Sequence, residues 1–232
     1  MLPDASGTLW PLCWACNNTF RRSTRGVVPI SFSTSQGLTS VIAQAKEEPD
    51  RWWIRVGLAS LLYTFMNEHR TCLERLAYGT FDYVTVVPSH PSKRAGRDHL
   101  KDLQRSVAPE AWDAWPWDLD LLLKMHPSGA DDRRGAIDKT LFQTSGVHNL
   151  AGRRVLLVDD LYTSGGTIAS AAAALTAAGA DPPVVLTIGR HLQATDAAVR
   201  AFIEASEAIG RRGFERTTCA VHVDDTPWVD YF

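Results

Sequence analysis

The chain has 232 residues, of which 45% are hydrophobic and 22% are charged, and its formal net charge is −2. This balance is typical of a globular protein with one medium-sized domain, or with a domain and a small appendage. Because the two signs of charge nearly cancel, electrostatic attraction of the whole chain to nucleic acid or to a membrane surface is excluded. No apolar run reaches the roughly 20 residues that span a bilayer. The first residues lack the basic region of a signal peptide, so we expect a cytoplasmic protein.

Two of the four cysteines, Cys13 and Cys16, form a C-x-x-C pair. This is the ligand spacing of half a zinc ribbon, but no second pair follows to complete a site of four ligands. Distant Cys or His residues could complete it, although we favour reduced thiols or the remnant of a lost site over bound zinc. We assign residues 1–50 to a small N-terminal appendage or hood that carries this pair, and residues 51–232 to the main domain.

Hydrophobic periodicity predicts the first secondary-structure elements. We expect a weak strand over 27–32, a helix over 38–46 and a longer helix over 51–78 that ends at Gly79. The apolar face of the longer helix is expected to hold Trp52, Val56, Ala59, Leu62 and Met66. Residues 83–87 are β-branched and aromatic, which predicts a strand that stops at Pro88.

A basic loop follows that strand, over residues 88–100. Since ligands bind at the carboxyl ends of strands in open α/β sheets, the loop is expected to face the ligand crevice. Its cationic and hydroxyl groups could stabilise a leaving anion; the alternative is an exposed basic loop that binds nothing. The candidate residues are Ser89, His90, Lys93, Arg94 and Arg97.

The next segments predict a strand over 118–124 and a polar loop over 126–140. A loop of this length inside a compact domain is usually functional. Its cations Arg133, Arg134 and Lys139 are candidates to contact a ligand, or are simply solvated. Trp112, Trp115 and Trp117 could stack on a planar base, although aromatic clusters are more often packing.

Residues 155–167, VLLVDDLYTSGGT, carry the strongest chemical signal. Residues 155–158 are typical of a strand buried on both faces of a parallel sheet, and the two carboxylates that follow can accept hydrogen bonds from vicinal sugar hydroxyls. Hydroxyls and glycines then lead into an alanine-rich helix over 168–178, an arrangement that gathers backbone N–H groups around an anion. The candidate residues are Asp159, Asp160, Thr163, Ser164, Gly165, Gly166 and Thr167.

Two other phosphate-binding classes fit the sequence less well. A Walker A loop is absent from the chain, which excludes P-loop nucleotide hydrolysis. A receiver-type domain carries its paired acids after the first strand, whereas here about two thirds of the chain precedes them. A further strand over 184–189 completes an α/β pattern, for which we expect an open, mostly parallel sheet flanked by helices.

The segment 155–167 resembles the phosphoribosyl pyrophosphate (PRPP) signature of type I phosphoribosyltransferases. The resemblance implies the fold of that family, with Asp159 and Asp160 as the catalytic acid pair on the ribose 2- and 3-hydroxyls. It further implies that residues 163–167 bind the 5-phosphate, that residues 88–100 bind pyrophosphate, and that residues 126–140 form a lid over PRPP. Mg²⁺ would then bind together with PRPP, held mainly by ligand oxygens and water.

The loop over 88–100 is similar to the ComF-type, competence-associated branch of the family. Pro88, the His90-Pro91 pair and Gly96 match that pattern, as does the later Arg134-Gly135 pair. The chain departs from the pattern at Ala95, Arg97, Asp98 and His99.

The resemblance implies an enzyme that transfers phosphoribose from PRPP to an unidentified base or amine and releases pyrophosphate. The alternative is a PRPP- or nucleotide-binding module without turnover that serves competence or DNA uptake. The weakest hypothesis is a nucleic-acid adaptor that depends on zinc bound by the cysteine pair. We expect PRPP as the small-molecule partner, no membrane, and nucleic acid at most indirectly. The oligomeric state stays open, a homodimer included.

Overall fold

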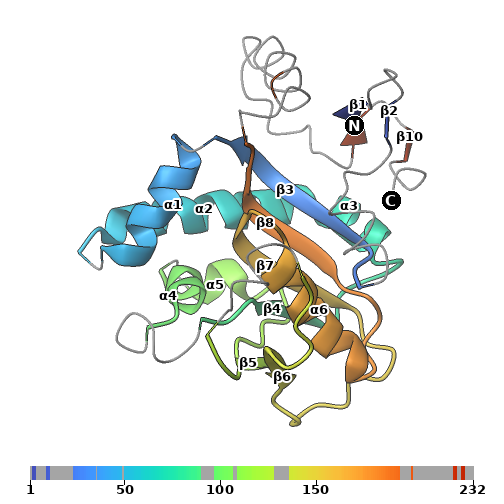
Figure 1. The fold of residues 1–232 in the computed structure, drawn as a ribbon. Helices are drawn as coiled ribbons and strands as arrows, with labels where there is room; N and C mark the ends of the chain where they lie inside the picture. The colour runs from blue at the N-terminus through green and yellow to red at the C-terminus, as the bar shows by residue number, and fades with distance from the viewer. Residues whose placement is uncertain are drawn as a thin grey trace.

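A four-stranded parallel sheet forms the centre of this computed structural model (Figure 1). In spatial order its strands are β3 (Gly26–Ser33), β8 (Val184–His191), β7 (Val155–Tyr162) and β4 (Tyr83–Val86). The structure describes residues 2–3, 9–10, 23–34, 36–48, 50–89, 97–106, 109–127, 136–193, 200, 222–223 and 226–227.

Helices cover both faces of this sheet. The connection from β3 to β4 contains α1 (Leu38–Glu47), α2 (Trp52–Glu68) and α3 (Arg70–Leu76), while α6 (Gly166–Ala177) connects β7 to β8. The two connections cross the sheet in opposite directions, so right-handed crossovers put them on opposite faces. Figure 1 accordingly shows α2 behind the sheet and α6 in front of it. The predicted α/β class, an open and mostly parallel sheet flanked by helices, is confirmed.

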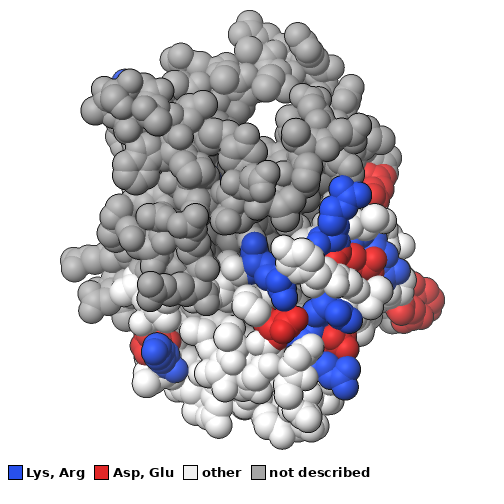
Figure 2. Space-filling model, turned by 90° about the vertical axis from the view of Figure 1, so that its right-hand side faces the viewer, with Lys and Arg blue, Asp and Glu red and all other residues white. Residues whose placement is uncertain are grey.

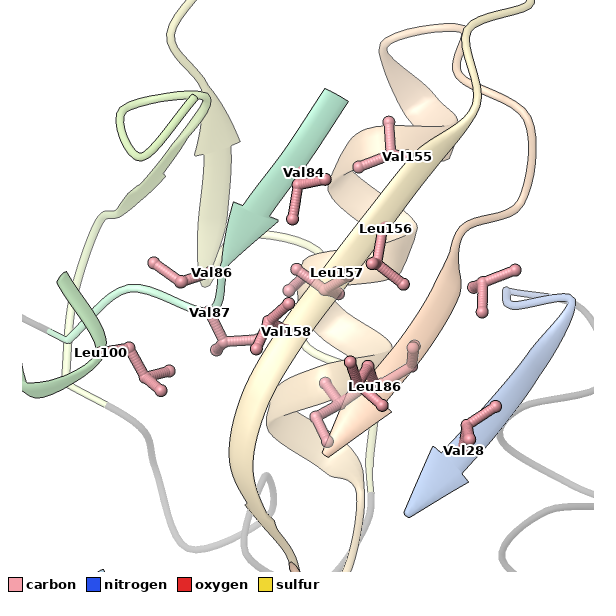
Figure 3. Packing of buried hydrophobic residues seen from close by; sticks show 14 of the residues in the cluster. Val28, Val84, Val86, Val87, Leu100, Val155, Leu156, Leu157, Val158 and Leu186 are labelled. Atoms are coloured by element: carbon pink, nitrogen blue, oxygen red, sulfur yellow. The ribbon is translucent and has the colours of Figure 1, made fainter. Parts of the chain in front are cut away.

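The core lies along the two central strands. Side chains of Val155, Leu156, Leu157 and Val158 on β7 are at most 1% exposed, as a strand covered on both faces requires. Figure 3 shows these side chains near those of β4, β8 and β3, and because neighbouring side chains of a strand point to opposite faces, this cluster lies on both sides of the sheet. The cluster includes Leu100 beyond the end of β4, so the apolar core reaches the carboxyl edge of the sheet.

Smaller elements flank the sheet. Helices α4 (His99–Arg105) and α5 (Pro109–Trp112) follow β4, and β5 (Leu122–Lys124) pairs antiparallel with β6 (Phe142–Thr144). Two further antiparallel pairs join β1 (Leu2–Pro3) to β2 (Leu9–Trp10) and β9 (His222–Val223) to β10 (Thr226–Pro227). The strand predicted over 118–124 is therefore shorter than expected, and it belongs to a separate sheet.

The single helix predicted over 51–78 is wrong, because the chain breaks at His69 into α2 and α3. His69 adopts φ −110° and ψ 21°, and its buried ring packs 4.5 Å from the ring of Phe65. No glycine or proline marks this break in the sequence. Trp52 was also placed wrongly on the buried face: it is the first residue of α2 and is 62% exposed.

The three tryptophans considered for base stacking lie in or against the core. Trp112 and Trp115 are 3% and 4% exposed, and Trp117 meets Trp112 edge to face at 5.2 Å. Arg70 lies over the Trp115 ring at 4.3 Å. Their contacts are those of packing residues.

The division of the chain at residue 50 stays a prediction. β3 and α1 precede that residue, yet β3 is a strand of the main sheet and α1 contacts it. In the part of the chain that the structure describes, no helix is both long and apolar enough to cross a bilayer. On the face in Figure 2, the described Lys and Arg side chains lie beside Asp and Glu, so they form no patch of one sign there.

Candidate functional site

A pocket of about 190 Å³ opens at the carboxyl edge of the sheet, between β4, β7 and the start of α6. This is the position at which open α/β sheets bind their ligands. The described residues that line it are Lys46, Val87, Pro88, Ser89, Leu100, Lys124, Asp159, Asp160, Leu161, Thr163, Ser164, Gly165, Thr167 and Ile168.

The two adjacent aspartates are part of β7 itself, because the strand runs on to Tyr162 instead of ending at residue 158. Asp159 is in register with Thr187 of β8. Neighbouring side chains of a strand point to opposite faces of its sheet. Asp159 and Asp160 therefore enter the pocket from the two faces of β7.

Asp160 points toward the face that α1 covers. Its side chain is 6% exposed, and the Nζ of Lys46 lies 2.7 Å from each of its two carboxylate oxygens. The Nε2 of the buried His99, at the start of α4, is 3.6 Å from Oδ2 of the same carboxylate. A buried carboxylate needs such partners, since an unpaired charge in the interior is very costly.

Asp159 has a different environment. Its Oδ1 accepts a hydrogen bond of 2.9 Å from the backbone N–H of Asp160. Burial, and then the charge of Asp160, raise the pKa of Asp159 to about 8, against the lowering effect of Lys46 and Lys124. The two carboxylates thus differ in their partners.

The hydroxyl- and glycine-rich loop leads directly from β7 into α6. Gly165 precedes the helix with φ 81°, a left-handed conformation that glycine adopts without strain. No side chain caps this helix N-terminus, so the N–H groups of its first turn can bind an anion. Thr163, Ser164, Gly165 and Thr167 line the pocket, and Gly166 is the buried first residue of α6.

A stretch of 54 residues is 48% identical to an adenine phosphoribosyltransferase of Mycobacteroides abscessus. The similarity covers 23% of this chain and 29% of that relative, so it spans less than a third of either protein. No protein-family model matches the chain.

The predicted pyrophosphate loop is described only at its two ends. Ser89 lines the pocket, and its backbone N–H donates a hydrogen bond of 2.9 Å to Oδ2 of Asp98. Arg97 is paired with Asp102 on α4 at 3.2 Å, and it does not line the pocket. His90, Lys93 and Arg94 lie outside the described residues.

The predicted lid begins and ends at the antiparallel strands β5 and β6. His126 follows β5 and its Nε2 lies 3.4 Å from Oδ2 of Asp138, so the two flanks of the segment are in contact. Lys139 is exposed beside β6, whereas Arg133 and Arg134 lie outside the described residues.

Among the described residues, no cluster of three or more His, Cys, Asp or Glu could hold a metal ion. Lys46 already occupies both oxygens of Asp160, so these side chains do not form a protein cage for Mg²⁺. They fit a hydrated ion that arrives with its ligand's own oxygens. Cys13 and Cys16 lie outside the described residues, and zinc stays untested.

The sequence does not identify two pocket residues, Lys46 and Lys124, nor His99, which lies behind Asp160. Lys46 is 114 positions from its partner, and nothing near it in the sequence distinguishes it from other helical lysines. Lys124 reaches the pocket from β5 with its ammonium 5.2 Å from the Phe142 ring centre. Only tertiary structure brings these cations to the acid pair.

Proposed function

We propose that this protein binds PRPP with Mg²⁺ and transfers its phosphoribosyl group to a base or amine, releasing pyrophosphate. The observation that carries this proposal is one pocket that joins an acid pair to an uncapped helix N-terminus. A sugar phosphate has the matching groups, vicinal hydroxyls and a phosphate. The similarity to an adenine phosphoribosyltransferase supports the same class of ligand and makes adenine the first acceptor to test.

Within this proposal, the residues of the pocket bind and orient the sugar phosphate. The 5-phosphate lies against the loop of residues 163–167, where N–H groups and the positive end of α6 favour an anion. The ribose hydroxyls lie beside the acid pair. Pyrophosphate leaves on the side of Ser89, which lines the pocket just beyond the carboxyl end of the neighbouring strand β4.

The reaction breaks the bond from C1 of the ribose to a pyrophosphate oxygen and forms a bond from C1 to the acceptor nitrogen. The electron pair of the broken bond stays on pyrophosphate, and bound Mg²⁺ supplies charge neutralisation there. The chain's own contribution is electrostatic: Lys124 and Lys46 bring positive charge to the pocket wall. Exclusion of water protects the electron-poor C1 from hydrolysis.

A second candidate is a PRPP-binding module without turnover, related to the ComF-like branch and its role in competence. One observation favours it: Arg97, a predicted pyrophosphate contact, is paired with Asp102. A protein that lacks cationic contacts on the leaving group would hold PRPP without accelerating its cleavage.

The test is pyrophosphate release from PRPP with Mg²⁺, measured across a panel of bases that begins with adenine. PRPP binding is measured in parallel by titration calorimetry. Release with one base supports the enzyme; binding without release from any base supports the module. The variant Asp159→Asn/Asp160→Asn is expected to abolish both signals.

Asp120→Asn is the matched control for that variant. Asp120 is 79% exposed and pairs with Lys101 outside the pocket, so its loss should change neither binding nor release. A wild-type protein that is folded and binds no PRPP would overturn both candidates.

A further inference from the structure

We propose that Lys46 is a positioning residue of this pocket and that it gives the two adjacent aspartates different roles. Asp160 is held by the protein, and Asp159 is the acid that accepts from the ligand. The proposal rests on the function proposed above. It also departs from the symmetrical roles expected from the sequence, in which each aspartate holds one ribose hydroxyl.

The first argument is the geometry at Asp160. The Nζ of Lys46 is 2.7 Å from Oδ1 and 2.7 Å from Oδ2, so it is centred on the carboxylate. Each carboxylate oxygen can accept about two hydrogen bonds, and Lys46 takes one position on both. On another side of the carboxylate, Nε2 of His99 lies 3.6 Å from Oδ2 of Asp160, which is too long for a hydrogen bond but close enough for electrostatic contact.

The second argument is the environment of Asp159. Within the described part of the chain, the one hydrogen bond to its carboxylate comes from the backbone N–H of Asp160. The remaining acceptor positions lie in a pocket that also contains Thr163 and Gly165. Vicinal hydroxyls of a sugar held by the phosphate loop would meet Asp159 first.

The third argument is the position of Lys46 in the fold. It lies in the last turn of α1, where a cation also interacts favourably with the helix dipole. Its link to Asp160 ties the connection after β3 to the central strand β7. Lys46 therefore fixes both the orientation of one acid and the wall of the pocket on that side.

Direct contact of Lys46 with a ligand phosphate is the competing role. In that case the losses caused by removing Lys46 and Asp160 would be independent, because each residue would contact the ligand itself. If Lys46 acts through Asp160, removing both costs no more than removing one. A double-mutant cycle therefore separates the two roles.

The experiment measures PRPP affinity by titration calorimetry for the wild type, Lys46→Met, Asp160→Asn and the double variant. Each single variant is expected to weaken binding about tenfold or more, since each leaves a buried charge or its partner unpaired, and the double variant is expected to match them. Lys46→Arg should restore affinity to within about threefold, because it keeps the charge. Asp159→Asn should weaken binding further when added to Lys46→Met.

Lys101→Met and Asp120→Asn form the control cycle, since this Lys–Asp pair lies outside the pocket. Circular dichroism and thermal unfolding of each variant confirm that it is folded; Lys46→Gln replaces Lys46→Met if the latter does not fold. Additive losses, or full affinity in folded Lys46→Met, would overturn this proposal alone. A wild type that does not bind PRPP would overturn the proposed function with it.

Discussion

The backbone N–H of Ser89 donates a hydrogen bond of 2.9 Å to Oδ2 of Asp98, across the loop that separates β4 from α4. The other oxygen of Asp98 accepts from the N–H groups of Leu100 and Lys101, which makes Asp98 the N-cap of α4. One carboxylate thus fixes the start of a helix and the position of Ser89, a loop residue that lines the pocket. Asp98 therefore has a structural role at this position of the loop.

Asp98→Ala is expected to lower the free energy of unfolding by about 1–3 kcal/mol, because a helix cap and a hydrogen bond to a charged acceptor are both lost. PRPP affinity should also fall, since Ser89 loses the partner that positions it. Asp98→Asn separates the two effects, because asparagine still caps the helix with its carbonyl oxygen, whereas its NH2 group cannot accept a hydrogen bond from Ser89. Urea unfolding and calorimetry provide the measurements; equal stability of Asp98→Ala and the wild type would contradict the prediction.

Gly165→Ala is expected to destabilise the protein by roughly 1–2 kcal/mol, because an alanine at φ 81° is strained. It should also weaken PRPP binding by about tenfold or more, since glycine is what lets the backbone approach a ligand closely.

Gly152→Ala separates strain from binding. Gly152 has φ 65° and no atom near the position of an added Cβ, and it does not line the pocket. Its replacement should cost similar stability and leave PRPP affinity unchanged. Equal losses of affinity in the two variants would show that strain alone, and no local contact of Gly165, is responsible.

Much of the fold could be predicted because its signals are local. The apolar run at 155–158 and the alanine-rich stretch after Thr167 identify β7 and α6 with few competing interpretations. Pro88 correctly limits β4. The break at His69 could not be predicted, since it depends on burial of that ring against Phe65 and on no helix-breaking residue.

The candidate site could be predicted only in part, because only its contiguous residues give a local signal in the sequence. The acid pair and the phosphate loop are contiguous in sequence, and the structure gathers them around one pocket. Lys46 and Lys124 reach the pocket from distant elements, so only tertiary packing reveals them. Arg97 has the right charge for the leaving-group side, yet its guanidinium is turned to Asp102. Composition alone could not have distinguished these cations.

The acidity of Asp159 predicts how stability depends on pH. Its pKa is about 8 in the folded protein and 3.8 in the unfolded chain, so between these values only the folded state holds the proton. The free energy of unfolding therefore falls as the pH rises from about 4 to about 8. Asp159→Asn should reduce this slope and be more stable than the wild type at pH 9 by at least about 1 kcal/mol, the equivalent of one pKa unit.

Thermal and urea unfolding test this dependence of the free energy of unfolding on pH. The measurements cover about pH 5–9, a range that includes the raised pKa of Asp159. Asp120→Asn serves as the control: a hydrogen bond from Lys101 lowers the pKa of Asp120, so its effect on stability appears only in acid. Its slope from pH 5 to 9 should match the wild type, within the error of the fits. Identical slopes for Asp159→Asn and the wild type would contradict the assignment.

Ligand binding should reverse the protonation of Asp159. Sugar hydroxyls donate to a carboxylate more strongly than to a carboxylic acid, so PRPP is expected to lower the pKa of Asp159 and to release up to roughly one proton at pH 7. PRPP affinity should then rise as the pH approaches 8. Calorimetry in two buffers with different heats of ionisation counts the protons released, and Asp159→Asn at saturating PRPP should release fewer. The same count in both proteins would mean that Asp159 is not the acid that accepts from the ligand.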